Sequence, residues 1–339
     1  MSSIAYRKQF RVLSVTLAVG VAIMGVKFFT YLITGSNAVL ADALESIINV
    51  VAGSFALYSI YFAARPKDLD HPYGHGKMEF VSAGFEGGLI TLAGLAIICK
   101  SIYNFFVSSH LGNLDYGLVL TVITGAINFF MGLILVKMGT NNRSAIMVAD
   151  GRHLKSDAYT SVGLLLGLGI VYLTHVAWLD NVVAIMFGLF IIYTGIKTVR
   201  EAYAGIMDEA DLLLIDNLIA ILNKHRSPNW IDIHNLRVIK YGPDYHIDCH
   251  VTLPWYFNLT EVHDEMEEIA ATIKEHLGHE VEFFIHPDPC LPTSCKLCTK
   301  PDCTVRRQPF EYRVDWTPAI VMKNKKHGLD QSLPPSPTN

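Results

Sequence analysis

The chain has 339 residues, of which 51% are hydrophobic and only 17% are charged. That length suits two or three soluble domains, but the composition leaves too few charged groups to cover their surfaces. About six segments of roughly 20 residues, each able to cross ~30 Å of hydrocarbon, account for the apolar excess. The net charge of −4 and the lack of a long basic block exclude a nucleic-acid-binding protein, and the composition excludes a disordered chain and a secreted disulfide scaffold. We therefore expect an integral membrane protein with one soluble part.

Six apolar stretches are the expected membrane spans. The first is too long for the apolar region of a signal peptide and lacks a small-residue cleavage site, so we interpret it as a retained span. An even number of spans places both ends of the chain on the same side of the membrane. The expected ranges are 12–34, 38–63, 79–107, 114–138, 145–176 and 180–204.

Positive charge is distributed unevenly between the two sets of connections. The loops at 35–38, 108–115 and 174–181 contain no Lys or Arg. Because Lys and Arg accumulate in cytoplasmic loops, both termini are expected to be cytoplasmic. The basic residues of the other connections are Arg7, Lys8 and Arg11 before the first span, Arg65, Lys67 and Lys77 after the second, Arg143, Arg152 and Lys155 around the start of the fifth, and Arg200 near the end of the sixth.

Beyond about residue 208 the pattern is that of a soluble domain. We expect helices at 209–225 and from Asn258, where Glu261 completes a capping box, and strands at 231–241, 245–253 and 281–285. The order αββαβ predicts a small open sheet with both helices on one face. The expected organisation is a transmembrane domain at 1–207, a cytoplasmic domain at 208–289, a Cys-rich segment at 290–305 and a polar, disordered tail at 306–339.

Four of the six cysteines lie close together near the C-terminus, at positions 290, 295, 298 and 303. Such a group is either a set of thiolate metal ligands or a small disulfide knot. A cytosolic position keeps thiols reduced, which favours metal binding. Taken singly, each of them is equally well an inert thiol. The four candidate ligands are Cys290, Cys295, Cys298 and Cys303.

Ionisable residues inside membrane spans are costly, so each one is a candidate for function. Glu45 and Asn49 in the second span, and His153 and Asp157 in the fifth, are both i,i+4 pairs that share one helix face. A lone His at the end of a span is more often interfacial, but two matched pairs on separate spans indicate a site for one divalent cation. Asp42 is either functional or a structural partner of Lys27 or Lys77, and for Glu79, Glu86 and Asn128 we favour hydrogen bonding between helices.

The connection between the second and third spans carries a second candidate metal site. Asp68, His71 and His75 have spacings of three and four residues, which suit metal binding on a tight loop. A solvated polar loop is the alternative for any one of these residues.

These motifs together resemble the cation diffusion facilitator family of metal-ion/proton antiporters. The resemblance covers residues 10 to about 290 and rests on SNAVLADALESIIN at 36–49, DLDHPYGHGK at 68–77 and HLKSDA at 153–158. It implies a homodimer with a six-helix, all-α transmembrane bundle and a cytoplasmic ferredoxin-like α+β domain. It also implies three groups of metal ligands. These are a transport site at Glu45, Asn49, His153 and Asp157, a loop site at Asp68, His71 and His75, and a cytoplasmic cluster at His234, His250, His286 and Asp288 with His263 as a bridge.

The chain departs from the family pattern at two positions of the transport site. Zinc-exporting members usually carry His or Asp, then Asp, where this chain has Glu45 and Asn49. A site richer in oxygen and poorer in charge favours Mn²⁺ or Fe²⁺ over Zn²⁺.

The resulting hypothesis is an exporter of zinc, iron or manganese in the inner (plasma) membrane, which exchanges cytosolic metal for protons. His153 and Asp157 are the candidate proton-coupling residues, since only the neutral imidazole binds metal. One rival is a transport-incompetent relative that acts as a metal sensor or scaffold. An intramembrane metalloenzyme is disfavoured, because the sequence has no His-Glu-x-x-His motif. We expect neither an enzyme nor a nucleic-acid partner.

Overall fold

A computed structural model describes residues 3–34, 37–106, 115–174, 178–242, 244–277 and 281–327. The chain divides into two compact units, residues 2–207 and 208–339, and each is described by itself.

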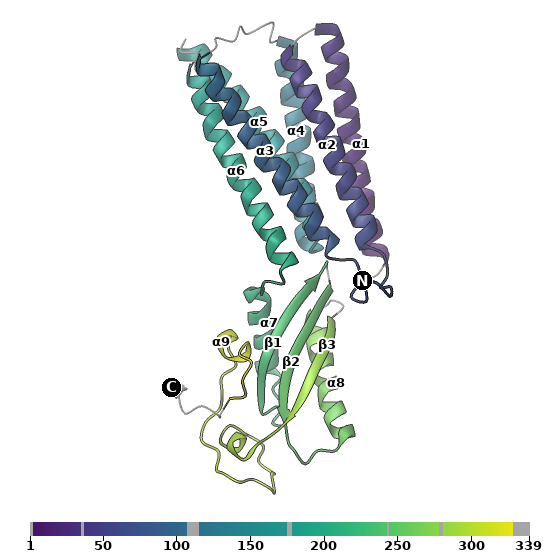
Figure 1. Cartoon of the computed structure of the whole chain (residues 1–339), viewed down its shortest axis with the longest axis vertical. Helices are drawn as coiled ribbons and strands as arrows, with labels where there is room; N and C mark the ends of the chain where they lie inside the picture. Colours follow the sequence, from purple (N-terminus) through teal and green to yellow (C-terminus); the bar gives the residue numbers. More distant parts are fainter. Residues whose placement is uncertain are drawn as a thin grey trace. The chain divides into compact units, whose positions relative to one another are not determined.

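The first unit consists, in its described part, of long helices (Figure 1). The first helix begins nine residues before the apolar stretch that we expected at 12–34. Among the described residues, four segments are long and apolar enough to cross a membrane: Tyr6–Phe29, Met78–Asn104, Val122–Asn141 and Asn181–Ile206. The unit is therefore a multi-pass membrane domain, while the count of six spans stays a prediction. The helices are α1 (Ser3–Thr34), α2 (Asn37–Ala63), α3 (Met78–Phe106), α4 (Asp115–Asn141), α5 (Ala145–Thr174) and α6 (Trp178–Ile206).

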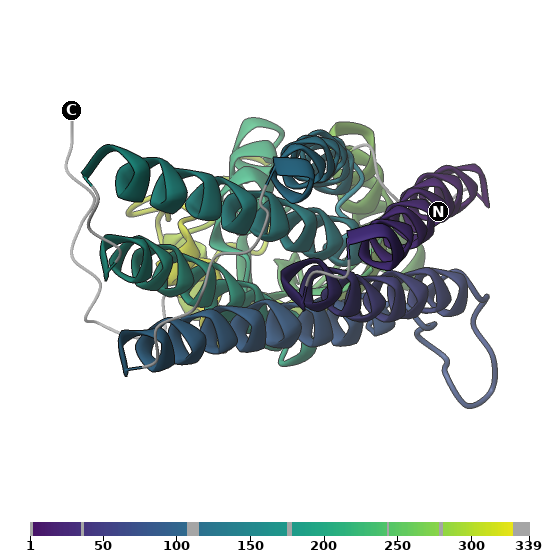
Figure 2. The ribbon, with the colours of Figure 1, turned by 90° about the horizontal axis from the view of Figure 1, so that it is seen from above.

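Small residues allow several of these helices to approach closely. Helix α3 packs along α6, and α4 packs along α5; Figure 2 shows α3 and α6 running alongside one another. A Cβ atom at Gly87 would lie 2.8 Å from the backbone nitrogen of Val199, and one at Gly132 would lie 2.7 Å from the carbonyl oxygen of Gly151. In a bilayer the hydrophobic effect does not drive helices together, because the lipid is also apolar. The van der Waals contacts of closely packed helices stabilise the bundle instead. Because α5 also contacts α2 and α3, polar groups on these three helices lie within reach of each other.

The second unit contains, in its described part, a three-stranded sheet, two longer helices and one short helix. The strands lie in the order β1-β2-β3, with β1 antiparallel to β2 and β2 parallel to β3. The side chain of Asp211 caps the first helix, and Asn258 with Glu261 forms the expected capping box of the second. The elements are α7 (Leu212–Lys224), β1 (Asp232–Tyr241), β2 (Asp244–Leu253), α8 (Leu259–Leu277) and β3 (Val281–Pro289), followed by a 3₁₀ turn (Pro292–Lys296) and the short helix α9 (Pro318–Val321).

The segment that follows the sheet does not form the disordered tail that we expected from residue 306. Val314, Trp316 and Val321 are at most 4% exposed and belong to the same hydrophobic core as α7, α8 and the sheet. The guanidinium of Arg226 stacks on the Trp316 ring at 3.7 Å from its centroid and donates a hydrogen bond to the carbonyl oxygen of Val314. The expectation was therefore wrong for residues 306–327, and residues 328–339 lie outside the described part of the chain.

Candidate metal sites

Three of the four residues expected to form the transport site lie together between α2 and α5. The Nδ2 amide of Asn49 donates a hydrogen bond of 2.6 Å to Asp157 Oδ2, and Asn49 Oδ1 lies 3.1 Å from His153 Nε2. Because the amide oxygen is only an acceptor, this contact places a proton on Nε2 of the imidazole. The i,i+4 spacing of His153 and Asp157 directs both side chains of α5 toward α2, as the sequence pattern predicts. Asn49 therefore links the two α5 residues.

Glu86 of α3 is a further member of this group that the sequence reasoning did not assign to it. Its side chain is fully buried, and its Oε2 atom lies 3.6 Å from His153 Nδ1. Both carboxylate oxygens lack a hydrogen-bond partner in the described part of the chain, so our expectation of a hydrogen bond between helices was wrong for Glu86. A carboxylate in the middle of an apolar stretch was the available signal, but the sequence does not indicate which helix it faces.

The remaining charged residues of this region are only partly described. The side chains of Asp42 and Glu45 lie outside the described part, so neither the Glu45 ligand nor the pairing of Asp42 is tested. Lys27 is buried. The Nζ atom of Lys77 is 3.4 Å from the carbonyl oxygen of Ile206, to which it donates.

The loop between α2 and α3 brings Asp68, His71 and His75 together. Asp68 Oδ1 accepts a hydrogen bond of 2.7 Å from the backbone N–H of His71 and lies 3.0 Å from its Nδ1, while Asp68 Oδ2 is 3.4 Å from His75 Nε2. A tight turn at Gly74, with φ of +88°, returns the chain so that His75 faces the aspartate. Desolvation opposes the shift, but the hydrogen bonds from His71 lower the pKa of Asp68. An anionic carboxylate and two imidazoles thus lie close enough together to bind one cation.

The cytoplasmic cluster follows from strand register. His234 of β1 is paired with His250 of β2, and His250 is paired with His286 of β3. Residues paired across neighbouring strands lie on the same face about 5 Å apart, so the three imidazoles form a row across the sheet. Asp288 is two residues beyond His286 and therefore projects from the same face.

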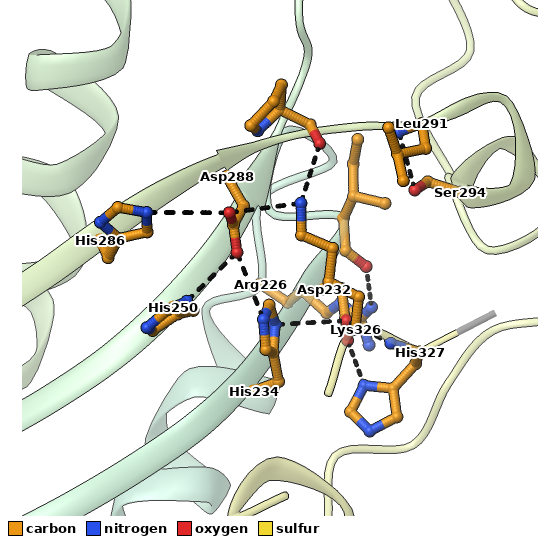
Figure 3. Close-up of polar contacts among 12 residues, drawn as sticks. Arg226, Asp232, His234, His250, His286, Asp288, Leu291, Ser294, Lys326 and His327 are labelled. Atoms are coloured by element: carbon orange, nitrogen blue, oxygen red, sulfur yellow. Dashed lines mark hydrogen bonds and ion pairs between the residues drawn. The ribbon is translucent and has the colours of Figure 1, made fainter. Parts of the chain in front are cut away.

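Asp288 connects the members of this row (Figure 3). Its Oδ2 atom lies 3.3 Å from both His234 Nε2 and His250 Nδ1, and its Oδ1 atom lies 3.8 Å from His286 Nε2. Burial lowers the pKa of His234, which favours the neutral ring that binds metal. Desolvation raises the pKa of Asp288, but the Lys326 ammonium and the hydrogen bond from His250 lower it by more. His263, the expected bridge, is exposed on α8 and is not part of this group in the described chain.

Two residues from the far end of the described chain complete the surroundings of this cluster, and no sequence pattern had indicated them. Lys326 Nζ lies 3.3 Å from Asp288 Oδ1, and the backbone N–H and ring of His327 both contact Asp232, the ring at 2.6 Å. Asp232 Oδ2 lies in turn 3.6 Å from His234 Nδ1. Figure 3 shows these side chains meeting the cluster from the side opposite His286.

The four clustered cysteines are free thiols that line one pocket with Tyr256, Lys300 and Arg306. Within the described residues, three potential ligand atoms lie within 4.8 Å of one another at the loop site and at the sheet cluster. The sulfur atoms of the four cysteines are more widely spaced.

The phenol of Tyr256 borders the same pocket. Burial and a hydrogen bond with Cys303 raise the pKa of Tyr256 to about 12.

Comparison with known proteins identifies the class to which the two units belong. Residues 13–207 match the cation efflux transmembrane domain, and residues 211–290 match the cytoplasmic domain of cation efflux proteins. The chain therefore belongs to the cation efflux, or cation diffusion facilitator, family, whose members are membrane transporters of metal cations and not enzymes.

Relatives from bacteria and plants agree with this assignment. The chain is 31% identical over 283 residues to an uncharacterized transporter of Synechocystis, an alignment that covers 83% of this chain and 90% of the relative. It is 26% identical over 279 residues to the cation-efflux pump FieF of Salmonella arizonae, covering 80% and 90% of the two chains. It is 29% identical over 305 residues to metal tolerance protein C1 of Arabidopsis thaliana, covering 85% of this chain and 64% of that protein.

Proposed function

We propose that this protein exports a divalent transition metal from the cytosol in exchange for protons, and that Mn²⁺ or Fe²⁺ is preferred over Zn²⁺. It does so as a homodimer in the plasma (inner) membrane, with six spans, both termini in the cytosol and a ferredoxin-like cytoplasmic domain. Metal binds between α2 and α5 at Glu45, Asn49, His153 and Asp157. The observation that carries this proposal is the pair of contacts by which Asn49 joins His153 to Asp157.

The donor set accounts for the proposed metal preference. Asn49 contributes a neutral amide oxygen, Asp157 contributes an anionic oxygen and His153 contributes one nitrogen. Oxygen donors suit Mn²⁺ and Fe²⁺, whereas zinc exporters of the family usually add a second carboxylate at position 49. The hydrogen bond to Asp157 also holds the Asn49 amide in place before the metal arrives. The entropic cost of ordering this side chain on metal binding is therefore small.

Glu86 orients His153 for metal binding. In the absence of metal, Nε2 of the imidazole donates to Asn49, so Nε2 must give up its proton before it can bind a cation. The opposite nitrogen, Nδ1, faces Glu86 at 3.6 Å. A carboxylate behind a metal-binding histidine accepts the Nδ1–H and fixes the tautomer whose Nε2 is free. Glu86 thereby also supplies a negative charge near the site, as a zinc exporter's second aspartate would.

Proton exchange follows from the chemistry of the ligands. Metal binds the neutral imidazole of His153 and the ionised carboxylate of Asp157, so binding releases any protons held there and metal release takes protons up. If the two states of the bundle open to opposite sides, this exchange couples metal efflux to inward proton movement.

The other two groups are proposed to bind metal without carrying it across the membrane. The cluster of His234, His250, His286 and Asp288, with His263 as a bridge between subunits, senses cytosolic metal and stabilises the dimer. The loop site of Asp68, His71 and His75 binds metal close to the start of α3.

Transport in vesicles tests this function. Purified protein in vesicles with a pH gradient is presented with Mn²⁺, Fe²⁺, Co²⁺, Zn²⁺ and Cd²⁺, and metal and proton fluxes are recorded together. We expect coupled flux that is highest for Mn²⁺ or Fe²⁺ and is abolished by Asp157→Asn. Metal binding without flux for any cation would instead support the sensor or scaffold.

A further inference from the structure

The four C-terminal cysteines line a small cavity that carries the first inference. Cys290 lies at the end of the matched cytoplasmic domain, and the other three lie beyond it. The cavity has a volume of about 20 Å³, enough for one water-sized sphere. Cysteines separated by up to 13 positions in the sequence thus line one space of the size of a single ion.

The hydrogen bonds around this cavity suit thiolates. The backbone N–H of Arg307 donates to the sulfur of Cys295 at 3.4 Å, and the backbone of Trp255 donates to the sulfur of Cys290. Such donors stabilise the negative charge of a coordinating sulfur. The guanidinium of Arg306 holds the loop by donating to the carbonyl oxygens of Cys295, Cys298 and Lys300 at 2.7–3.1 Å.

The charge balance also suits a cation bound by four sulfurs. Four thiolates around one divalent ion have a net charge of −2, and the side chains of Lys300 and Arg306 lie beside them. Burial and the other cysteines raise the pKa of the Cys290 thiol in the absence of metal, but a coordinating cation deprotonates such a thiol. Each sulfur turns about a single side-chain torsion, so the four can close around an ion.

We propose that Cys290, Cys295, Cys298 and Cys303 bind one thiophilic divalent cation of the zinc class in a closed tetrahedral site. The four thiols release their protons to solvent on binding. A site with four protein ligands has no open position, so its role is structural. It fixes residues 290–306 against the end of β3 and so supports the segment that continues to α9.

Cobalt spectroscopy on the full-length protein tests this site. Reduced protein in detergent is titrated with Co²⁺, and we expect sulfur-to-cobalt charge-transfer absorption with tetrahedral ligand-field bands, of the intensity of one four-sulfur site per chain and displaced by Zn²⁺. Cys295→Ser with Cys298→Ser should remove this absorption, whereas the control Cys99→Ser, in α3, should not change it. Absence of the absorption from the wild type, or its persistence in the double variant, would contradict the proposal.

A second readout needs no variant. Zn²⁺ should slow alkylation of all four clustered cysteines together, measured by mass spectrometry. Cys249 serves as an internal reference, because burial raises its pKa to about 12 and it reacts slowly with or without metal. Protection of fewer than three of the four, or disulfide bonds between them in the reduced cytosol-like buffer, would overturn the tetrahedral site.

The contact between Lys326 and Asp288 carries a second, independent inference, which rests on the proposed metal binding by the sheet cluster. The Lys326 side chain is only 18% exposed, and its ammonium donates to the carbonyl oxygen of Pro289 at 3.2 Å in addition to its ion pair with Asp288. The chain before it is held by a hydrogen bond from the N–H of Asn235 to the carbonyl oxygen of Lys323. A tethered cation therefore occupies the carboxylate oxygen that faces His286.

We infer that Lys326 competes with metal for the cytoplasmic cluster. A divalent cation bound between His286 and Asp288 would be repelled by an ammonium on the same carboxylate, so one of the two must leave. While Lys326 is in place, it lowers the apparent affinity of the cluster for metal. When the cytosolic metal concentration rises, metal displaces the ammonium and releases the segment around Lys326.

Hydrogen exchange of the full-length protein tests this competition with Zn²⁺ as the probe. We expect Zn²⁺ to slow exchange at β3 and to speed exchange at residues 322–327. Lys326→Met should lower, several-fold, the Zn²⁺ concentration that gives half of the slowing at β3. Lys325→Met, exposed and adjacent, is the control and should leave that concentration unchanged. Slower exchange at β3 with residues 322–327 unaltered would contradict the competition alone; no response at β3 would contradict the cluster as well.

Discussion

Asn49 and Asp157 lie on different helices, α2 and α5, and are joined by a hydrogen bond of 2.6 Å from the amide to the carboxylate. The oxygen of the same amide, Asn49 Oδ1, lies 3.1 Å from Nε2 of His153. One neutral side chain thus aligns an anionic and a nitrogen ligand. In the proposed transport site, Asn49 occupies the position where zinc-exporting members of the family usually carry an aspartate.

Replacing this amide by a carboxylate should change the metal preference. Asn49→Asp adds a negative charge beside Asp157, which favours Zn²⁺ over Mn²⁺ by an expected factor of about ten in relative affinity, equivalent to ~1.4 kcal/mol. Binding of both metals to the purified variant is measured by calorimetry. Asn128→Asp, on α4, is the matched control and should leave the ratio unchanged. An unchanged ratio in Asn49→Asp would remove Asn49 from the ligand set.

Neutralising Glu86 should weaken metal binding without removing a ligand. Glu86→Gln retains the shape of the side chain but loses the carboxylate that faces His153, and losses of about 10–100-fold in metal affinity are typical for such partners. Glu79→Gln, another buried carboxylate on α3, is the control. Equal effects of the two substitutions on Mn²⁺ affinity would show that Glu86 acts only through the packing of α3.

The loop site should account for one metal ion per chain that transport does not require. Asp68→Asn removes the negative charge of the carboxylate whose two oxygens contact His71 and His75, so equilibrium dialysis should give one bound Zn²⁺ fewer per chain, with metal flux in vesicles retained. Asp70→Asn, exposed on the same loop, should leave the stoichiometry unaltered. An undiminished stoichiometry in Asp68→Asn would rule out this loop as a metal site.

Two adjacent glycines on α3 should differ sharply in their tolerance of a methyl group. A Cβ at Gly87 would meet the backbone of α6 at 2.8 Å, whereas one at Gly88 has no neighbour within 4 Å. Gly87→Ala should therefore destabilise the bundle by about 1–3 kcal/mol through overpacking, and Gly88→Ala should not. Thermal unfolding of the detergent-solubilised protein checks this, and similar midpoints for the two variants would contradict the close contact of α3 and α6.

Trp316 should be essential to the stability of the cytoplasmic unit, although it lies outside the matched family domains. It is 2% exposed and stacks on Arg226, so Trp316→Ala should cost about 3–5 kcal/mol. The exposed Phe310 provides the control substitution Phe310→Ala. Hydrogen exchange of α7 and β1 in the full-length protein measures the loss, and equal protection in both variants would contradict the packing of this segment.

Local patterns predicted much of this molecule. The i,i+4 spacing of His153 and Asp157 placed both on one face of α5, and the alternation of polar and apolar residues at 245–253 predicted β2. Glu86 could not be placed in the same way, because which face of α3 meets α5 depends on the packing of glycines such as Gly87 against α6. The side chain of Glu45 lies outside the described residues, so that part of the predicted site stays a prediction.

The cytoplasmic cluster combines a predictable and an unpredictable part. The family resemblance implied its histidines. Their alignment in one row depends on strand register, and β1 carries an irregularity between His234 and Arg237 that the alternation of side chains along a strand does not reveal. The contacts of Lys326 and His327 were missed for another reason. A polar composition after Cys303 suggested disorder, whereas a few buried residues such as Trp316 are enough to hold the segment on the domain.

The position of the bound metal tests the central claim most directly. Anomalous diffraction from crystals grown with Mn²⁺ should place an ion between α2 and α5, within bonding distance of Asn49 Oδ1, His153 Nε2 and a carboxylate oxygen of Asp157, with Glu86 against the opposite nitrogen of the imidazole. A bundle with no ion at this position at saturating Mn²⁺, or with Asn49 turned away from the ion, would contradict the account.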